Sequence, residues 1–216
     1  MRAFGIDISH WQSPYKYSPV DFVIMKTSGG LMLDPAYNSI KAEVMNCPVK
    51  GAYHYQSSAV PWQAQADFFL NASAFADFIV MDVEPTYNSM TGSFVADAVK
   101  GMGYLALNAH KPVLFYCNPN AWNTYFFPFR AELMKYELWF ARYWFSRLPT
   151  DPAVPANMRQ DWRFWQYSDR GKGFGCSGSS VDLNVYNGTV EDLQTWIANS
   201  HWKICPTCNG SGKVPA

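Results

Sequence analysis

The stretch FIVMDVEP, residues 78–85, has the pattern of a short buried strand that ends on two carboxylates. Alternation along a strand places Asp82 and Glu84 on one face, about 6.6 Å apart along the chain. Because Pro85 follows at once, the pair lies at the carboxyl end of the strand. Two carboxylates in a confined site raise one pKa, which supplies an acid that is still protonated near neutral pH. A capping or salt-bridging pair is the alternative interpretation.

Similar apolar segments recur along the chain and alternate with helical patterns in its first half. Strands are expected at residues 3–8, 21–26, 49–55, 78–83, 112–117, 138–143, 162–167 and 181–186. Helix starts are expected at Asp34–Pro35, at Pro61, near Thr91, and at a capping box formed by Thr189 and Asp192. Residues 144–161 and 168–180 lack helical periodicity and are expected to be loops.

This order of elements predicts an α/β fold with a parallel sheet covered by helices. Eight strands in one domain favour a TIM-like (β/α) barrel with irregular, helix-poor last strands, about (β/α)5(β)3. In a closed barrel the first and last strands are neighbours. Asp7, in GIDISHWQ, and Asp182, in SVDLNVY, are therefore expected at the same rim as Asp82 and Glu84.

The composition excludes several classes of protein. The chain has 216 residues, of which 49% are hydrophobic, so it can bury a core and is not disordered. Lys plus Arg and Asp plus Glu both total 17, so there is no basic surplus for binding nucleic acid. No apolar run reaches the roughly 18–20 residues of a membrane span. The first residues enter a strand pattern at once, and no signal peptide is expected.

Seven motifs, in order, resemble those of glycoside hydrolase family 25, the Chalaropsis-type lysozymes that are common among bacteriophage endolysins. They are GIDISHWQ, DFVIMKTSGG, VKGAYHYQ, FIVMDVEP, VLFYCN, LWFARYW and the pair WQYSDRG and VDLNVYNGT. The resemblance covers about residues 1–200. It implies a β/α barrel that hydrolyses, without a cofactor, the β-1,4 bond between N-acetylmuramic acid and N-acetylglucosamine in bacterial peptidoglycan.

The resemblance also implies roles for individual residues. Glu84 matches the general acid, Asp82 its partner, and Asp7 and Asp182 the other two carboxylates of the acidic site. The expected substrate-binding residues are Tyr53, Tyr116, Trp139, Tyr143 and Gln166. The implied mechanism is retaining and assisted by the substrate's 2-acetamido group, an exception to the two-carboxylate scheme. A nucleophilic Asp82 or an inverting reaction stays open. The chain departs from the family pattern at KTSGG, where many relatives have an acidic residue before the glycine.

The tail after residue 200 differs in composition, which suggests a catalytic domain at residues 1–200 and a tail at 201–216. CPTCNGSGK resembles a half-site of the zinc-binding repeats of DnaJ-type chaperones. Cys205 and Cys208 supply two of the four ligands that zinc usually takes, so a structural zinc would need a second chain and produce a homodimer. The alternatives are a disulfide between these two cysteines or a flexible tail with free thiols.

The function predicted from the sequence is that of a peptidoglycan muramidase of the phage endolysin type. Such an enzyme accumulates in the host cytoplasm and reaches the cell wall through a holin. A virion-associated lysin or an exported autolysin agrees with the same residues. The rival functions are a chitinase-like hydrolase of N-acetylglucosamine polymers and a wall-binding lectin without catalysis.

Overall fold

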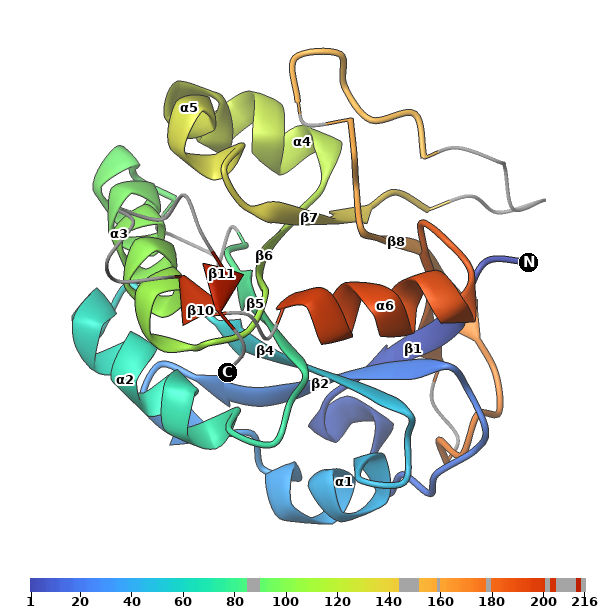
Figure 1. Cartoon of the computed structure of the whole chain (residues 1–216). Coiled ribbons are helices and arrows are strands. Elements are labelled where there is room, and N and C mark those ends of the chain that lie inside the picture. Colours follow the sequence, from blue (N-terminus) through green and yellow to red (C-terminus); the bar gives the residue numbers. More distant parts are fainter. Residues whose placement is uncertain are drawn as a thin grey trace.

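The computed structural model describes residues 1–84, 90–143, 152–158, 160–177 and 180–200, and the backbone of residues 203–204 and 213–214. Its centre is a closed barrel of strands, which Figure 1 shows nearly end-on. In order around the barrel the strands are β1 (Phe4–Ile8), β9 (Val181–Tyr186), β8 (Phe164–Gly171), β7 (Glu137–Ala141), β6 (Val113–Cys117), β5 (Phe78–Asp82), β4 (Val49–Tyr55) and β2 (Phe22–Gly29). Pairing between β1 and β2 closes the ring. The TIM-like α/β barrel and its eight expected strands are confirmed.

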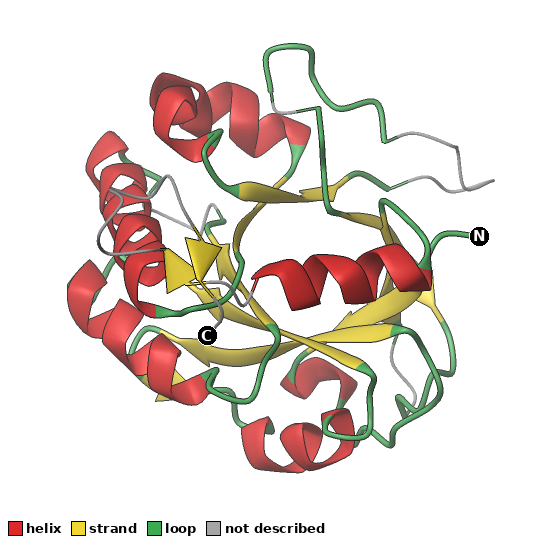
Figure 2. Cartoon of the chain, viewed as in Figure 1, coloured by secondary structure: helices red, strands yellow, loops and turns green. Residues whose placement is uncertain are grey.

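Helices α1 (Tyr37–Val44), α2 (Trp62–Ala72), α3 (Gly92–Asn108), α4 (Pro119–Ala121) and α5 (Arg130–Leu133) lie outside the barrel wall (Figure 2). The single 3-10 turn η1 (His10–Gln12) follows β1, and α6 (Val190–Ser200) lies across one end of the barrel. Two short pairings complete the structure: β3 (Met32–Leu33) with the end of β2, and β10 (Lys203–Ile204) with β11 (Lys213–Val214). The described residues between β7, β8 and β9 contain no helix, as the helix-poor second half predicts.

The caps of α3 and α6 confirm two of the helix starts that the sequence predicts. Thr91 Oγ1 accepts the N–H of Phe94 at 3.2 Å at the start of α3. Thr189 and Asp192 form the reciprocal capping box of α6, with distances of 2.9 and 3.2 Å. Helix α1 begins at Tyr37, later than expected, because the Asp34 carboxylate accepts the N–H of Ala36 in a turn before the helix.

The helical segment between β6 and β7 is not predicted by the sequence pattern. It runs from α4 through a π-helical turn, η2 (Trp122–Phe126), and a 3-10 turn, η3 (Phe127–Phe129), into α5. Pro128 interrupts it, and the number of residues per turn changes along its length. Its apolar residues therefore do not repeat with the period of a regular α-helix.

Two expectations about the last strands are wrong. The sheet is not parallel throughout, because β9 runs antiparallel to both β8 and β1. Residues 168–171 are not loop but the end of β8, which continues to Gly171 through two irregularities in its pairing with β9. In this part of β8, Ser168 and Asp169 are half-buried and Arg170 is exposed, so the segment lacks the apolar run by which strands are usually recognised.

The barrel interior is packed with aromatic side chains, and α6 covers its amino end. Phe22, Phe78 and Phe164 are fully buried inside the barrel. The ring of Phe164 stacks on Phe78 at a centroid distance of 4.8 Å and meets Phe22 edge to face at 4.9 Å. Trp196 of α6 lies 5.6 Å from Phe78 and 5.8 Å from Phe164. Figure 1 shows α6 lying across this opening, so the opposite, carboxyl end is left for a site.

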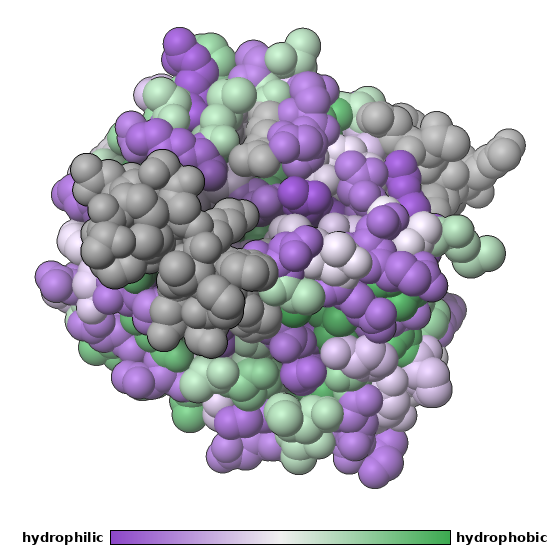
Figure 3. Space-filling model, viewed as in Figure 1, coloured by the Kyte–Doolittle hydropathy of each residue, from purple (hydrophilic) through white to green (hydrophobic). Residues whose placement is uncertain are grey.

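The surface around α6 mixes residue types. Hydrophilic and hydrophobic side chains alternate over the described part of the face in Figure 3. Among the described residues, the helices are all too short or too polar to cross a membrane.

Gly5→Ala tests the packing of the barrel interior. A Cβ at Gly5 would overlap both the carbonyl oxygen and the ring of Phe22. We expect the substitution to lower the free energy of unfolding by about 1–3 kcal/mol through overpacking. Gly92→Ala is the control, because no atom lies within 4 Å of its added Cβ. Urea unfolding measures both, and equal stability of the two variants would contradict the packing described.

Candidate active site

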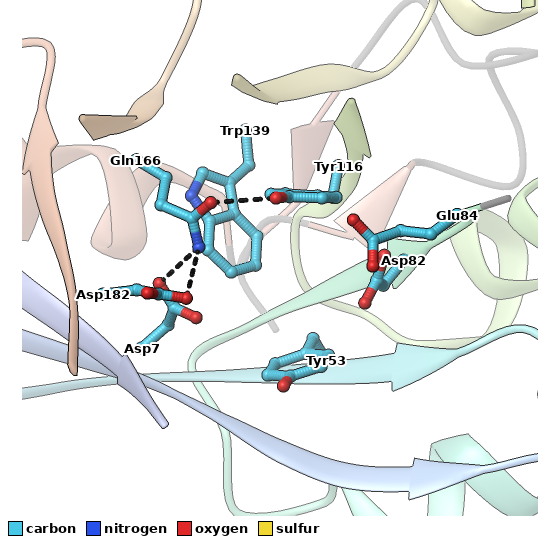
Figure 4. A pocket seen from close by; sticks show the side chains of 8 residues that line it. All are labelled: Asp7, Tyr53, Asp82, Glu84, Tyr116, Trp139, Gln166 and Asp182. Atoms are coloured by element: carbon cyan, nitrogen blue, oxygen red, sulfur yellow. Dashed lines mark hydrogen bonds between the residues drawn. The ribbon is translucent and has the colours of Figure 1, made fainter. Parts of the chain in front are cut away.

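The carboxyl ends of the barrel strands enclose a hollow that contains four carboxylates. The inward row of β5 begins with Phe78 and Val80 and continues through Asp82, and Glu84 two residues later lines the same hollow. Figure 4 shows the Asp82–Glu84 pair on one side of this space and the Asp7–Asp182 pair on the other. The lining residues are Asp7, Tyr53, Asp82, Glu84, Tyr116, Trp139, Gln166 and Asp182.

Asp182 reaches this end because β9 is antiparallel. As the second residue of β9, it would lie at the opposite end of the barrel if the strand were parallel. The register instead pairs Asp182 directly with Asp7. The structure thus brings the two aspartates together for a reason that the sequence pattern did not contain.

The side-chain amide of Gln166 connects both aspartates to the aromatic wall. Its Nε2 donates to Asp7 Oδ2 at 2.8 Å and to Asp182 Oδ2 at 3.1 Å (Figure 4). Its Oε1 accepts the hydroxyls of Tyr116, at 2.8 Å, and Tyr143, at 3.0 Å. Gln166 is buried, and both ends of its amide are bonded, so it holds four side chains in fixed positions.

Asn184 is a second support that the sequence analysis missed. It is fully buried, its Nδ2 donates to Asp7 Oδ2 at 2.7 Å, and its Oδ1 accepts the indole N–H of Trp139 at 2.8 Å. The Trp139 ring is in edge contact with Tyr116 and Tyr53, at centroid distances of 4.8 and 6.1 Å. Alternation from Asp182 through VDLNVY could have indicated Asn184 as the next inward residue.

The Asp7–Asp182 pair has raised pKa values. Burial raises both, and the nearby Asp7 and Asp169 carboxylates raise the pKa of Asp182 further. Hydrogen bonds from Gln166 and Asn184 oppose the effect of burial at Asp7. The charge of the pair is therefore favoured on Asp7 and the proton on Asp182. Asp169, at the outer edge of β8, is a further carboxylate that the sequence analysis did not select.

The carboxyl groups of Asp82 and Glu84 also have raised pKa values. Burial and the Glu84 charge raise the pKa of Asp82 well above its usual range, and burial raises the pKa of Glu84. Asp82 Oδ1 is buried and has no hydrogen-bond partner in the described structure. An unpaired buried acceptor beside a second acid is the arrangement expected where a ligand N–H binds.

Lys26 is a cation close to this pair and was also missed. Its charge lowers the pKa of both Asp82 and Glu84, against the effect of burial. Its ammonium nitrogen lies 4.8 Å from the centre of the Tyr55 ring. Phe22 and Ile24 precede Lys26 at alternate positions of β2 and face the interior, so strand alternation was the signal that could have found it.

The described residues contain no cluster of three or more His, Cys, Asp or Glu side chains placed to hold a metal ion. Cys205 and Cys208 lie outside these residues. The boundary at residue 200 between a catalytic domain and a tail remains a prediction.

A barrel whose carboxyl end holds paired acids within an aromatic wall has the site of a glycoside hydrolase. The chain belongs to glycosyl hydrolases family 25, whose model matches residues 6–176. It is a glycoside hydrolase of the lysozyme class, as the sequence analysis predicts.

The chain is also similar to individual proteins. The chain is 31% identical to the uncharacterized protein YegX of Escherichia coli (strain K12), over 89% of this chain and 72% of that protein. It is 28% identical to Lysozyme M1 of Streptomyces globisporus, over 91% of this chain and 71% of that protein. The fold is similar to that of the bacterial lysozyme from Streptomyces coelicolor, with a TM-score of 0.77 and 24% identity, over 93% of this chain and 98% of that one.

Asp182→Asn tests the electrostatic cost of the site. Burial raises the pKa of Asp182 to about 8, so the folded state binds a proton that the unfolded state has released above about pH 4. Folding stability therefore falls as pH rises toward and through about 8. We expect the variant's melting temperature to fall less than that of the wild type between about pH 5 and pH 9.

The control is Asp97→Asn, a half-exposed aspartate on α3 that pairs with Lys100. We expect it to leave the wild-type pH dependence of the melting temperature in place. A wild-type stability that does not fall with rising pH would contradict the raised pKa of Asp182.

Proposed function

We propose that this family 25 enzyme is a retaining muramidase in which Glu84 is the general acid and base and Asp82 positions the substrate's acetamido group. The observation that carries the proposal is the Asp82–Glu84 pair at the barrel mouth, in which Asp82 is buried with an unpaired Oδ1 and Glu84 is half-buried. An acetamido N–H is a donor of the kind that this oxygen lacks.

Substrate binding would place the proton on the correct acid. Burial raises the pKa of Asp82 more strongly than that of Glu84, so a proton on the pair is favoured on Asp82 before substrate binds. An N–H donated to Asp82 Oδ1 favours the charged form of Asp82. The one proton that Asp82 and Glu84 hold between them then resides on Glu84. From there it can be donated to the glycosidic oxygen.

The first step forms a bond within the substrate. Glu84 donates its proton to the glycosidic oxygen, which leaves as the hydroxyl of N-acetylglucosamine. The acetamido carbonyl oxygen attacks the anomeric carbon of N-acetylmuramic acid and closes an oxazolinium ring. The negative charge of Asp82 stabilises the positive charge that develops on the acetamido nitrogen.

The second step opens this ring. Glu84, now a carboxylate, accepts a proton from water as the water oxygen attacks the anomeric carbon. The bond to the acetamido oxygen breaks, the acetamide is restored, and the anomeric configuration is retained. Trp139, Tyr116 and Tyr53 form the wall against which the sugar rings bind, and Tyr143 extends it at the edge.

Glu84→Gln removes the proton donor and keeps the shape of the side chain. We expect turnover on purified cell walls to fall by about 10²–10⁴-fold. Glu132→Gln, the same change on exposed helix α5, is the control and should keep wild-type turnover. If Glu84→Gln retains more than about a tenth of the wild-type rate, Glu84 is not the acid.

Asp82→Asn tests the assistance by the substrate. We expect a severe loss of turnover, and we expect a thiazoline analogue of the oxazoline intermediate to inhibit the wild-type enzyme. The intact mass of enzyme quenched during turnover should show no added glycosyl group. A covalent adduct on Asp82 would replace this mechanism with a nucleophilic one and leave the family assignment unchanged.

The biological setting is also a proposal. We propose a phage-type endolysin that accumulates in the host cytoplasm and reaches the wall after holin action. Its support is the resemblance of the seven strand motifs to a family common among endolysins. Lysis of a host culture only when a holin is expressed with the enzyme would support this setting, and lysis by the enzyme alone would contradict it.

For the tail we propose a zinc ion shared by Cys205 and Cys208 of two chains, since one C-x-x-C pair supplies only half of a zinc site. We expect about 0.5 zinc per chain and a dimer that Cys208→Ser or a chelator converts to monomers, with barrel melting unchanged. Elemental analysis and light scattering measure these quantities. Less than about 0.1 zinc per chain in a monomer would contradict the shared site and leave a disulfide or free thiols.

A further inference from the structure

We propose that a groove beside the catalytic carboxylates binds the D-lactyl–L-alanine amide through which peptidoglycan peptides are attached to muramic acid. The inference rests on the proposed function and names a part of the substrate that the enzyme reads. The groove has a volume of about 500 Å³ and lies between the β2–β3 turn and the loop after β4. The residues that line it include Leu31, Met32, Tyr55, Gln56 and Ala59.

Most of the exposed surface of the groove is apolar, and its described lining carries no charged side chain. Leu31, Met32 and Leu33 are consecutive and are 46%, 75% and 42% exposed. Exposing a run of three apolar side chains to water is unfavourable, and such runs mark binding surfaces. Its place on the turn at the edge of the groove indicates an uncharged, partly apolar ligand.

The walls of the groove are held rigidly by buried polar groups. Gln65 donates to the carbonyl oxygens of Ser57, at 2.9 Å, and Val60, at 2.7 Å, and accepts the N–H of Ser57 at 2.8 Å. His54 links Gln65, at 3.3 Å, to Ser28 at 2.9 Å, and burial lowers the pKa of His54 to about 4, which keeps the ring neutral. The loop after β4 and the end of β2 are thus tied together, as a preformed binding site requires.

The groove and the catalytic hollow share no described lining residue, but two residues of the groove are backbone neighbours of Asp82. Tyr55 pairs in register with Asp82, and the N–H of Gln56 donates to the carbonyl oxygen of Asp82 at 2.9 Å. In the proposed mechanism the acetamido group on carbon 2 of the sugar lies on Asp82. The lactyl group is attached to carbon 3, the adjacent ring carbon, so it leaves the sugar close to these two residues.

The chemistry of this substituent matches the groove. The lactyl group and L-alanine each carry a methyl group, and a neutral amide joins them. Gln56 borders the groove, is 2% exposed, and its Oε1 lacks a hydrogen-bond partner in the described structure. The amide of the substituent supplies an N–H for such an acceptor, while its methyl groups cover Leu31 and Met32.

Ala59→Trp tests the proposal because Ala59 is exposed and lines the groove, so a large side chain there fills it. The substrates are glycan strands that carry stem peptides and the same strands after an amidase has removed the peptides, which leaves a lactyl carboxylate. We expect the wild type to have a kcat/KM about tenfold higher on peptide-bearing strands. The variant should bring this ratio close to one.

Ala106→Trp, at an exposed position of α3 outside the groove, is the matched control and should keep the wild-type ratio. The proposal is overturned if the wild type has no preference, if Ala59→Trp leaves the preference intact, or if it lowers both rates equally. A dimer that Ala59→Trp dissociates would also overturn it, because a second copy would then occupy the groove.

A binding measurement separates this inference from the proposed function. Calorimetric titration with N-acetylmuramyl-L-alanyl-D-isoglutamine requires no cleavage. We expect this ligand to bind the wild type about tenfold more tightly than N-acetylmuramic acid does, and Ala59→Trp to abolish the difference. Equal binding of the two ligands overturns the groove. If neither strand yields reducing muramic acid but the difference in binding persists, the proposed reaction fails and the groove stands.

Discussion

Because β9 runs antiparallel to β1, its second residue, Asp182, lies directly opposite Asp7 at the carboxyl end of the barrel. The same strand places Asn184 one inward position deeper, where it bonds to Asp7 and fixes the indole of Trp139. Gln166 on the neighbouring strand then spans both aspartates. The Asp7–Asp182 half of the acidic site and the indole of Trp139 therefore depend on the direction of one strand. Shifting β9 by one residue would turn Asp182 and Asn184 to its other face and remove their contacts with Asp7 and Trp139.

The site concentrates acids where water is partly excluded, which costs folding free energy. The protein limits this cost in two ways. Amide donors from Gln166 and Asn184 stabilise the negative charge on Asp7. The ammonium group of Lys26 stabilises negative charge on the Asp82–Glu84 pair. Among the described residues Asp82 Oδ1 is left without a hydrogen-bond partner, so part of the remaining cost lies where a substrate N–H would bind. In the adjoining groove, Gln56 Oε1 is likewise buried without a hydrogen-bond partner among the described residues, where a second N–H of the substrate would bind.

Much of the fold follows from local pattern. The eight apolar segments and the caps at Thr91 and Thr189 are visible in the sequence, because burial and capping act on neighbouring residues. The direction of β9 is not, because a six-residue strand has the same alternation in either direction. The segment 119–133 is missed because π and 3-10 turns and Pro128 disrupt its period. Among site residues, carboxylates in apolar strands are conspicuous, whereas Lys26 and Asn184 become apparent only when the inward row of each strand is followed to its end.

The reaction assigned to the site is tested most directly by mass spectrometry of the fragments released from purified peptidoglycan, with the reducing ends labelled by borohydride. A muramidase releases fragments whose reducing end is N-acetylmuramic acid, so the reduced sugar should be muramitol carrying the lactyl group and its peptide. Reduced ends of glucosaminitol would place the cut at the other glycosidic bond, and a bond cleaved in the peptide would remove the reaction from the sugar altogether. Either result would contradict the function that the Asp82–Glu84 pair supports.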